Sequence, residues 1–252
     1  MSSRKKRSAL VITLMAIGGL ITNRAVADPV PLVLDVNSMT PFTAASSFKD
    51  FATVLGYSGD VINGVYQGAA LANTSTAATG SSLSTGFYDQ QSAGAKVTWS
   101  PELSPLSTDP VNLYLDLNAS VLTDDSCFLA VTCSSMHGID VTFEIWGEEV
   151  FPSLPPLYGL IGYYREELDS TANINQTLLL AQSVEGPFNL GVIFEDASYS
   201  DIWLGDVSTS SALGSLDFSL SADVPNVPEP STMPLIGLGL LGLAAFRSWK
   251  FQ

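Results

Sequence analysis

Adjacent carboxylates are the residues of this chain whose types and spacing first suggest chemistry. They occur at Glu148–Glu149, at Glu166–Glu167 with Asp169 close behind, and at Glu195–Asp196. Two carboxyl groups held a short distance apart can hydrolyse glycosides. Spacing along the sequence does not report separation in space, however, and adjacent acids are frequent in a chain with 25 Asp and Glu residues. A glycoside hydrolase is therefore the least supported function, and we expect a protein that is not an enzyme.

The chain has one histidine, His137, which limits nucleophilic catalysis. A serine–histidine–aspartate arrangement would have to use it, and the sequence has no Gly-x-Ser-x-Gly turn to present a catalytic serine. A glycine loop that could hold phosphate is also missing from the sequence. We expect His137 to lie in a loop beside Gly138.

The two cysteines, Cys127 and Cys133, precede His137 with the spacing Cys-x5-Cys-x3-His. This is not one of the usual structural zinc spacings, and a fourth ligand such as Asp140 would be needed. The favoured alternative is a disulfide, because the ends of the chain predict export to an oxidising compartment. Closing so small a loop stabilises the fold by roughly 2 kcal/mol.

Calcium is the metal that best suits the acidic residues, because it prefers hard oxygen ligands. Asp124 and Asp125, with Ser126, are one candidate set, and Asp201 and Asp206 around a turn at Trp203 are another. Neither set resembles the twelve-residue calcium loop with its glycine and final glutamate. We therefore expect no cofactor and no metal site, with calcium as the alternative.

Several aromatic residues have the chemistry to stack on sugars, namely Tyr163, Tyr164, Tyr199 and Trp203. The alternative is that they pack in the core or at the rim of a sheet, because aromatic residues favour strands.

The N-terminal segment has the order of a secretory signal peptide. A basic block, Arg4–Arg7, precedes the apolar stretch 9–21, and Ala25 and Ala27 form a small-x-small cleavage pattern before Asp28. The apolar stretch is shorter than a comfortable membrane span. We predict that the secretion translocon exports the chain and that the mature protein starts at Asp28.

The C-terminal segment predicts a second contact with the membrane. Pro228 and Pro230 fix their backbone and lack an N–H, which favours an extended strip that a protease can bind. Glu229 is charged and must stay out of hydrocarbon. Residues 231–246 carry no charge. As a helix they would span roughly 24 Å, short of a membrane core of about 30 Å.

Arg247 and Lys250 follow this apolar run. The positive-inside tendency places them in the cytoplasm, and the N-terminal basic block also faces the cytoplasm during export. The two ends together place residues 28–225 outside the inner membrane.

The order Pro228-Glu229-Pro230, glycine-rich and leucine-rich run, and basic end resembles the PEP-CTERM sorting signal, over about residues 224–250. The resemblance implies a bacterial exported protein that is held transiently in the inner membrane. It also implies processing by exosortase, a membrane-embedded cysteine protease that recognises Pro228–Pro230. Proteins with this signal are associated with exopolysaccharide production and with surface or matrix roles. Arg247 and Lys250 are farther apart than in the denser basic cluster common in the family. An ordinary tail anchor is the alternative.

The charge of the exported part excludes some partners. Between Asp28 and Glu229, three basic residues stand against 25 acidic ones, a net charge of −22. Nucleic acids and anionic lipids are poor partners for such a field. Solubility and the binding of cations are favoured.

Alternating apolar and polar residues predict strands through most of the exported part. The clearest are 112–118 and 139–146, which we expect to pair as antiparallel neighbours. Many short alternating runs between turn residues predict an all-β antiparallel β-sandwich or jelly roll. The other candidate strands are 30–36, 94–99, 158–164, 177–182, 188–194, 202–207 and 215–222.

Two segments leave alternatives open. Residues 47–55 have helical apolar spacing, although a pair of buried strands fits nearly as well. Residues 69–86 are rich in small residues and fit a loop or a flat strand. We predict four regions: a signal peptide (1–27), an acidic β-rich domain (28–221), a proline-rich linker with the sorting motif (222–230), and a transmembrane sorting helix with a basic tail (231–252).

These observations favour an exported surface or extracellular-matrix protein with a structural or adhesive role. The alternative is a module that binds polysaccharide or calcium, and exopolysaccharide is the partner that both functions share.

Overall fold

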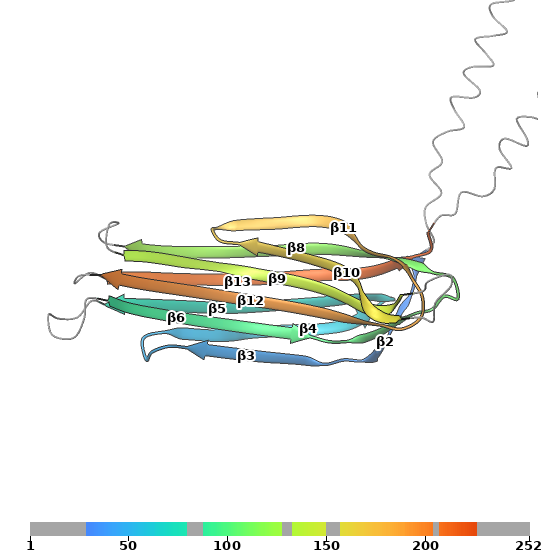
Figure 1. Ribbon diagram of the computed structural model, residues 1–252, viewed down its shortest axis with the longest axis horizontal. Coiled ribbons are helices and arrows are strands. Elements are labelled where there is room, and N and C mark those ends of the chain that lie inside the picture. Colours follow the sequence, from blue (N-terminus) through green and yellow to red (C-terminus); the bar gives the residue numbers. More distant parts are fainter. Residues whose placement is uncertain (1–28, 80–87, 128–132, 150–156, 204–206, 226–252) are drawn as a thin grey trace, which may run out of the picture. The chain divides into compact units, whose positions relative to one another are not determined.

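Alternating burial produces thirteen β-strands in the described part of the chain, and every pairing between them is antiparallel. A computed structural model describes residues 29–79, 88–127, 133–149, 157–203 and 207–225, which belong to one unit of the chain. The strands form two sheets that pack against one another (Figure 1). The prediction of an all-β antiparallel fold is confirmed.

Sheet A has the strand order β11-β8-β13-β5-β4, and β1 pairs with the end of β13. The bounds of its strands are β1 Pro29–Val30, β4 Phe51–Ile62, β5 Val65–Thr79, β8 Val111–Cys127, β11 Ala172–Val184 and β13 Val207–Asp223.

Sheet B has the order β10-β9-β12-β6-β3, and β7 pairs with both β12 and β2. The bounds of its strands are β2 Leu32–Val36, β3 Met39–Ala45, β6 Tyr88–Trp99, β7 Glu102–Pro105, β9 Cys133–Glu149, β10 Leu157–Leu168 and β12 Phe188–Trp203.

The core lies between the sheets and has an aromatic cluster around Phe218. The ring of Phe218 packs edge-on against Phe143 at 5.0 Å and against Trp99 at 5.8 Å between centroids. Gly68 of β5 makes room for it, because a Cβ at this position would lie 2.3 Å from the Phe218 ring. Edge-on aromatic pairs add to the stability gained from buried area.

The two clearest predicted strands exist, but the prediction that they pair is wrong. Residues 112–118 lie in β8 of sheet A, and residues 139–146 lie in β9 of sheet B. Their apolar side chains are buried between the two sheets. Alternation identifies the buried face of a strand but does not say which sheet the strand joins.

The helical alternative for residues 47–55 is wrong, because the segment is a turn followed by a single edge strand, β4. The register with β5 shifts between Val54 and Gly56, as in a β-bulge. A bulge breaks the two-residue period. The residues with helical spacing also share no buried face, since Phe48, Phe51 and Leu55 are 110%, 49% and 54% exposed. Residues 69–79 belong to β5, so the flat-strand alternative is correct up to Thr79.

Three predicted boundaries differ from the structure. The predicted strand 30–36 is divided at Pro31, with β1 in sheet A and β2 in sheet B, since proline cannot donate to a ladder. The predicted strand 202–207 combines the end of β12 with the start of β13. The last strand continues to Asp223, two residues past the predicted domain boundary.

The predicted signal peptide with its cleavage residues Ala25, Ala27 and Asp28, and the predicted sorting helix, lie outside the described residues. Within the part of the chain that the structure describes, no helix is both long enough and apolar enough to span a membrane.

Candidate functional site

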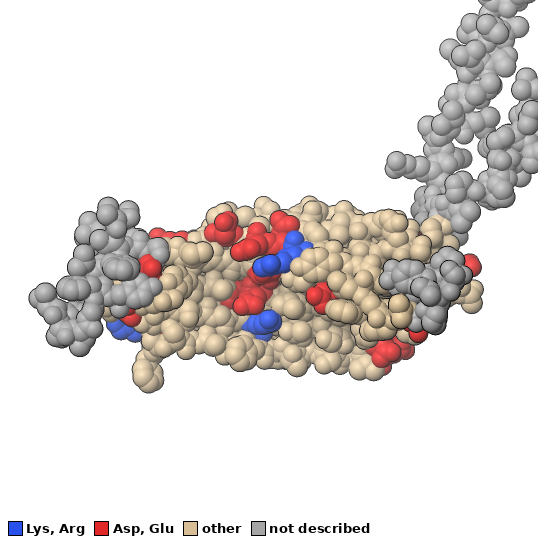
Figure 2. All heavy atoms as spheres, viewed as in Figure 1, with Lys and Arg blue, Asp and Glu red and all other residues tan. Residues whose placement is uncertain are grey.

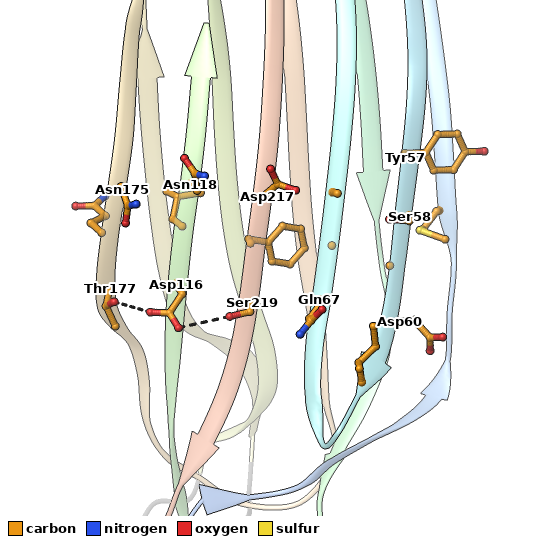
Figure 3. Close-up of a pocket in the computed structure, with 18 residues that line it drawn as sticks. Tyr57, Ser58, Asp60, Gln67, Asp116, Asn118, Asn175, Thr177, Asp217 and Ser219 are labelled. Carbon is orange, nitrogen blue, oxygen red and sulfur yellow. Dashed lines mark hydrogen bonds between the residues drawn. The ribbon is translucent and has the colours of Figure 1, made fainter.

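A polar groove of about 800 Å³ crosses the outer face of sheet A (Figure 3). The register of five neighbouring strands places its outward residues in two rows. One row is Asn175, Asn118, Asp217, Ala69 and Ser58, and the other is Thr177, Asp116, Ser219, Gln67 and Asp60. Because neighbouring strands lie ~4.8 Å apart, each row spans about 19 Å.

Alternation with core residues positions the side chains of the groove. In β8, Asp116 and Asn118 are exposed on either side of the buried Leu117. In β13, Asp217 and Ser219 flank the buried Phe218. Successive side chains of a strand point to opposite faces, so burial of the apolar residues turns the polar ones outward.

Asp116 is held in place by its neighbours in the groove. The hydroxyl of Thr177 donates to Oδ1, and Ser219 Oγ donates to Oδ2 at 3.5 Å (Figure 3). Within the described residues, the side chains of Asn118, Asn175 and Asp217 make no hydrogen bond. Side-chain amides both donate and accept, and carboxylates accept, so these groups suit a ligand rich in hydroxyls.

The charge of the groove is negative. Among the described residues, its lining includes Asp60, Asp116 and Asp217 and no Lys, Arg or His. Such a surface repels anions and favours neutral or cationic ligands. Over the described ranges, no group of three or more His, Cys, Asp or Glu side chains could hold a metal ion.

Charged side chains gather in a band on the outer face of sheet B (Figure 2). Lys96 Nζ lies 3.5 Å from Glu195 Oε2, and Arg165 forms an ion pair with Asp140 and lies 3.8 Å from Glu167 Oε2. These groups are at least partly exposed, so solvent screening leaves each pair little net effect on stability.

The structure separates the adjacent carboxylates that the sequence brings together. Glu195 is on the outer face of sheet B, whereas Asp196 is buried in the core. Glu167 lies near Arg165, whereas Glu166 accepts a hydrogen bond of 2.8 Å from the Tyr164 hydroxyl. Burial and this hydrogen bond raise the pKa of Tyr164 to about 12. Glu148 is exposed, and the side chain of Glu149 lies outside the described residues.

Asp196 belongs to a buried polar layer between the sheets. Thr74 Oγ1 donates to Asp196 Oδ1 at 3.3 Å, while Oδ2 is buried and has no hydrogen-bond partner in the part of the chain that the structure describes. Burial raises the pKa of Asp196 to about 7, although hydrogen bonds from Thr74 and the Gly214 backbone oppose the shift. The layer consists of Thr74, Thr76, Asp196, Ser198, Ser200, Ser208 and Ser210.

His137 is a strand residue of β9, so the predicted loop position is wrong. Its Nδ1 lies 2.6 Å from Asp125 Oδ2, and its side chain is 9% exposed. Ser198 pairs with His137 in the ladder between β12 and β9, but Ser198 Oγ and His137 Nε2 are both buried and have no hydrogen-bond partner among the described residues. The three residues therefore lack the hydrogen bond between serine and histidine that activates a nucleophile.

The predicted metal ligands are only partly described. Asp125 contacts His137, and the Asp124 carbonyl accepts from Ser211 Oγ at 3.3 Å. Asp206 lies outside the described residues. Cys127 ends β8 and Cys133 begins β9, but their side chains lie outside the description, so the disulfide stays a prediction.

The predicted sugar-stacking aromatics do not form one surface. Tyr163 is 55% exposed, whereas Tyr164 is half-buried and packs against Phe143 at 6.4 Å between ring centroids. Tyr199 is half-buried, and the side chain of Trp203 is not described. Sequence reasoning overlooked Trp146 and Tyr158, which are exposed on sheet B.

The groove residues Asn118, Asn175 and Asp217 were also not predicted. Each is an outward position of a strand, and alternation alone could have marked it as exposed. These residues lie side by side because of the strand order of sheet A, and that order cannot be predicted from local sequence pattern.

The sorting residues Pro228, Glu229 and Pro230 and the basic residues Arg247 and Lys250 lie outside the described residues. Residues 226–248 match the family model of the PEP-CTERM protein-sorting motif. The match confirms the predicted signal at the C-terminal end. The chain therefore carries the sorting motif of exported proteins that exosortase processes at the membrane.

Two solved structures with similarity to this chain are distant likenesses. TmCBM61, solved in complex with β-1,4-galactotriose, is 10% identical, with 71% of this chain and 86% of that chain covered and a TM-score of 0.25. Infectious bursal disease virus of the Gt strain is 9% identical, with 87% and 90% covered and a TM-score of 0.13. Such scores support no conclusion about fold or ligand. No curated protein matches the chain.

Proposed function

We propose that the chain is an exported bacterial surface or extracellular-matrix protein with a structural or adhesive role. One observation supports this best: the last strand, β13, ends at Asp223, and the matched sorting motif begins at residue 226. Removing the motif leaves every described strand complete. The sandwich is then free to act outside the inner membrane, and its excess of carboxylates keeps it soluble.

Mass spectrometry of the protein shed by producing cells tests this function. We expect a chain that starts near Asp28 and has lost residues 235–246. A shed chain that still carries the apolar run would contradict processing by exosortase. Retention of all of the protein in the inner membrane would contradict the surface or matrix role.

The groove on sheet A favours a second function, the binding of a polysaccharide. It presents side-chain amides and carboxylates in rows of about 19 Å, which is long enough for several sugar units. Its ligand would be a hydroxyl-rich polymer without negative charge, because Asp60, Asp116 and Asp217 repel anions.

Replacing Asp217 or Asn118 with alanine should weaken binding of the producer's exopolysaccharide about tenfold, since each change removes roughly 1.4 kcal/mol of hydrogen bonding. Isothermal titration calorimetry measures this change. Asp124→Ala is the matched control, because Asp124 is also exposed on β8 and lies about 20 Å along the strand from Asn118. Equal binding by Asp217→Ala, Asn118→Ala and the control would exclude the groove as the site.

A further inference from the structure

Exposed aromatic and apolar side chains gather on the outer face of sheet B, where β9 and β10 pair. Trp146 is 37% exposed, Tyr158 59%, Leu160 45% and Tyr163 55%. Leu160 lies directly opposite Trp146, while Tyr158 and Tyr163 lie opposite Glu148 and Glu144 on either side. We call Trp146, Tyr158, Leu160 and Tyr163 the aromatic platform.

Hydrogen bonds hold two of its rings by their polar edges. Trp146 Nε1 donates to Glu144 Oε2 at 2.8 Å, and the Tyr158 hydroxyl accepts from Asn189 Nδ2. Asn189 is on β12 and pairs with Trp146 in the ladder. A side chain that is already oriented loses less conformational freedom when a ligand binds to it. The platform is therefore organised before any ligand arrives.

The polar groups beside the rings indicate the class of ligand. Aromatic rings offer flat apolar surface, which suits the C–H face of a sugar ring. The carboxylates of Glu144 and Glu148 and the amide of Asn189 can bind hydroxyls at the edge of the same ring. The platform thus combines the two kinds of contact that a sugar needs.

Charge distinguishes a neutral sugar polymer from an anionic one. The two cations described on this face already have acidic partners, with Lys96 beside Glu195 and Arg165 beside Asp140. Glu144 and Glu148 leave the surroundings of the rings negative. Anionic polymers are repelled by this charge, and so is a second copy of this acidic chain.

The length of the platform fits a chain of sugars. From the Tyr158–Glu148 pair to the Tyr163–Glu144 pair the register advances by four residues of β9. At about 3.3 Å per residue the two tyrosines lie about 13 Å apart along the strand. A ligand that reaches from one to the other must contain more than one sugar ring.

We propose that the aromatic platform binds a neutral polysaccharide, on the face of the sandwich opposite the groove. The platform does not require the groove to bind sugar. If both faces bind, one sandwich holds two polymer chains together and acts as a cross-link in a matrix.

The test uses the full-length chain in detergent micelles, titrated with neutral cello-, manno- and galacto-hexaose and with an anionic oligogalacturonate. We expect at least one neutral hexaose to bind and the oligogalacturonate not to bind. Trp146→Ala and Tyr158→Ala should each weaken binding at least tenfold. Phe42→Ala is the matched control, because Phe42 is also exposed on sheet B but lies on the edge strand β3. It should leave affinity unchanged.

Tryptophan fluorescence supplies a second readout. Trp146 is exposed whereas Trp99 is fully buried, so a sugar stacked on Trp146 should shift the emission to shorter wavelength. Trp146→Phe keeps a ring at this position and should remove the shift while weakening binding less than alanine does. Thermal melts followed by circular dichroism check that each variant is folded.

The outcomes separate the two proposed sites. Binding that survives Trp146→Ala, Trp146→Phe and Tyr158→Ala but is lost in Asp217→Ala overturns the platform and leaves the groove standing. Binding by none of the neutral hexaoses, or preference for the anionic one, also overturns the platform. Loss in the platform variants with full binding by Asp217→Ala supports it.

Discussion

The wild-type domain should become less stable as the pH rises from about 4 to about 7, and replacing Asp196 with asparagine should abolish this pH dependence. Asp196 is fully buried, and its pKa is raised from 3.8 to about 7 mainly by that burial. Between these values the folded chain holds a proton that the unfolded chain has released. Its stabilising contribution is complete below about pH 4 and is lost as the pH passes through about 7.

The expected size makes this effect easy to measure. The free energy of unfolding should fall by about 1.4 kcal/mol per pH unit, or roughly 4 kcal/mol across the window. Asparagine has nearly the same shape and cannot ionise. Urea unfolding of wild type and Asp196→Asn at pH 4.5, 6 and 8 should give curves that diverge as the pH rises.

Two comparisons make the result specific to this carboxyl group. His137 and Asp125 lie in contact in the same sandwich, but they are present in both proteins and cancel in the difference. Glu195→Gln is the matched control, because Glu195 is the exposed neighbour that pairs with Lys96. It should retain the wild-type slope. Parallel profiles for wild type and Asp196→Asn would show that Asp196 is ionised in the folded protein.

Replacing Pro228, Glu229 and Pro230 together with alanine should block maturation. These residues lie within the matched sorting motif and are expected to be the element that exosortase recognises. The uncut chain should accumulate in the inner membrane, and the amount of shed protein should fall at least tenfold. Immunoblotting with an epitope placed after Gln252, combined with mass spectrometry of the medium, measures both quantities.

The fold of the sandwich should not change in this variant, since β13 ends five residues before Pro228. Ser231→Ala with Thr232→Ala is the control, because it alters the adjacent residues and leaves the three motif residues intact. Normal shedding of the triple-alanine chain, with the tail removed as in wild type, would show that recognition lies elsewhere.

Local periodicity predicts the strands and their buried faces well. Leu113, Leu115 and Leu117 are buried as their alternation predicts, and so are Ile139 and Val141. Periodicity fails where the backbone leaves its regular geometry. Strand β4 shifts its register after Val54, and the residues with helical spacing, Phe48, Phe51 and Leu55, are exposed and share no buried face. Periodicity also does not predict which strands pair, since β8 and β9 are consecutive strands of opposite sheets.

The sites were harder to predict than the fold for the same reason. The two rows of the groove take two residues from each of five strands, and the order of those strands is a property of the whole sandwich. The burial of Asp196 could have been predicted from the local sequence pattern. The inward positions of β12 continue from Phe194 through Asp196 to Ser198, so extending the predicted strand past Phe194 would have marked a buried acid.

The placement of β13 determines how the sandwich responds to tension. This strand pairs with β8 on one side and with β5 and β1 on the other, and the residues that lead to the sorting motif continue directly from it. A pull on the chain beyond Asp223 that is directed along the strand loads the ladders on both sides of β13 at once. The exported domain should therefore resist mechanical extraction while one end is tethered.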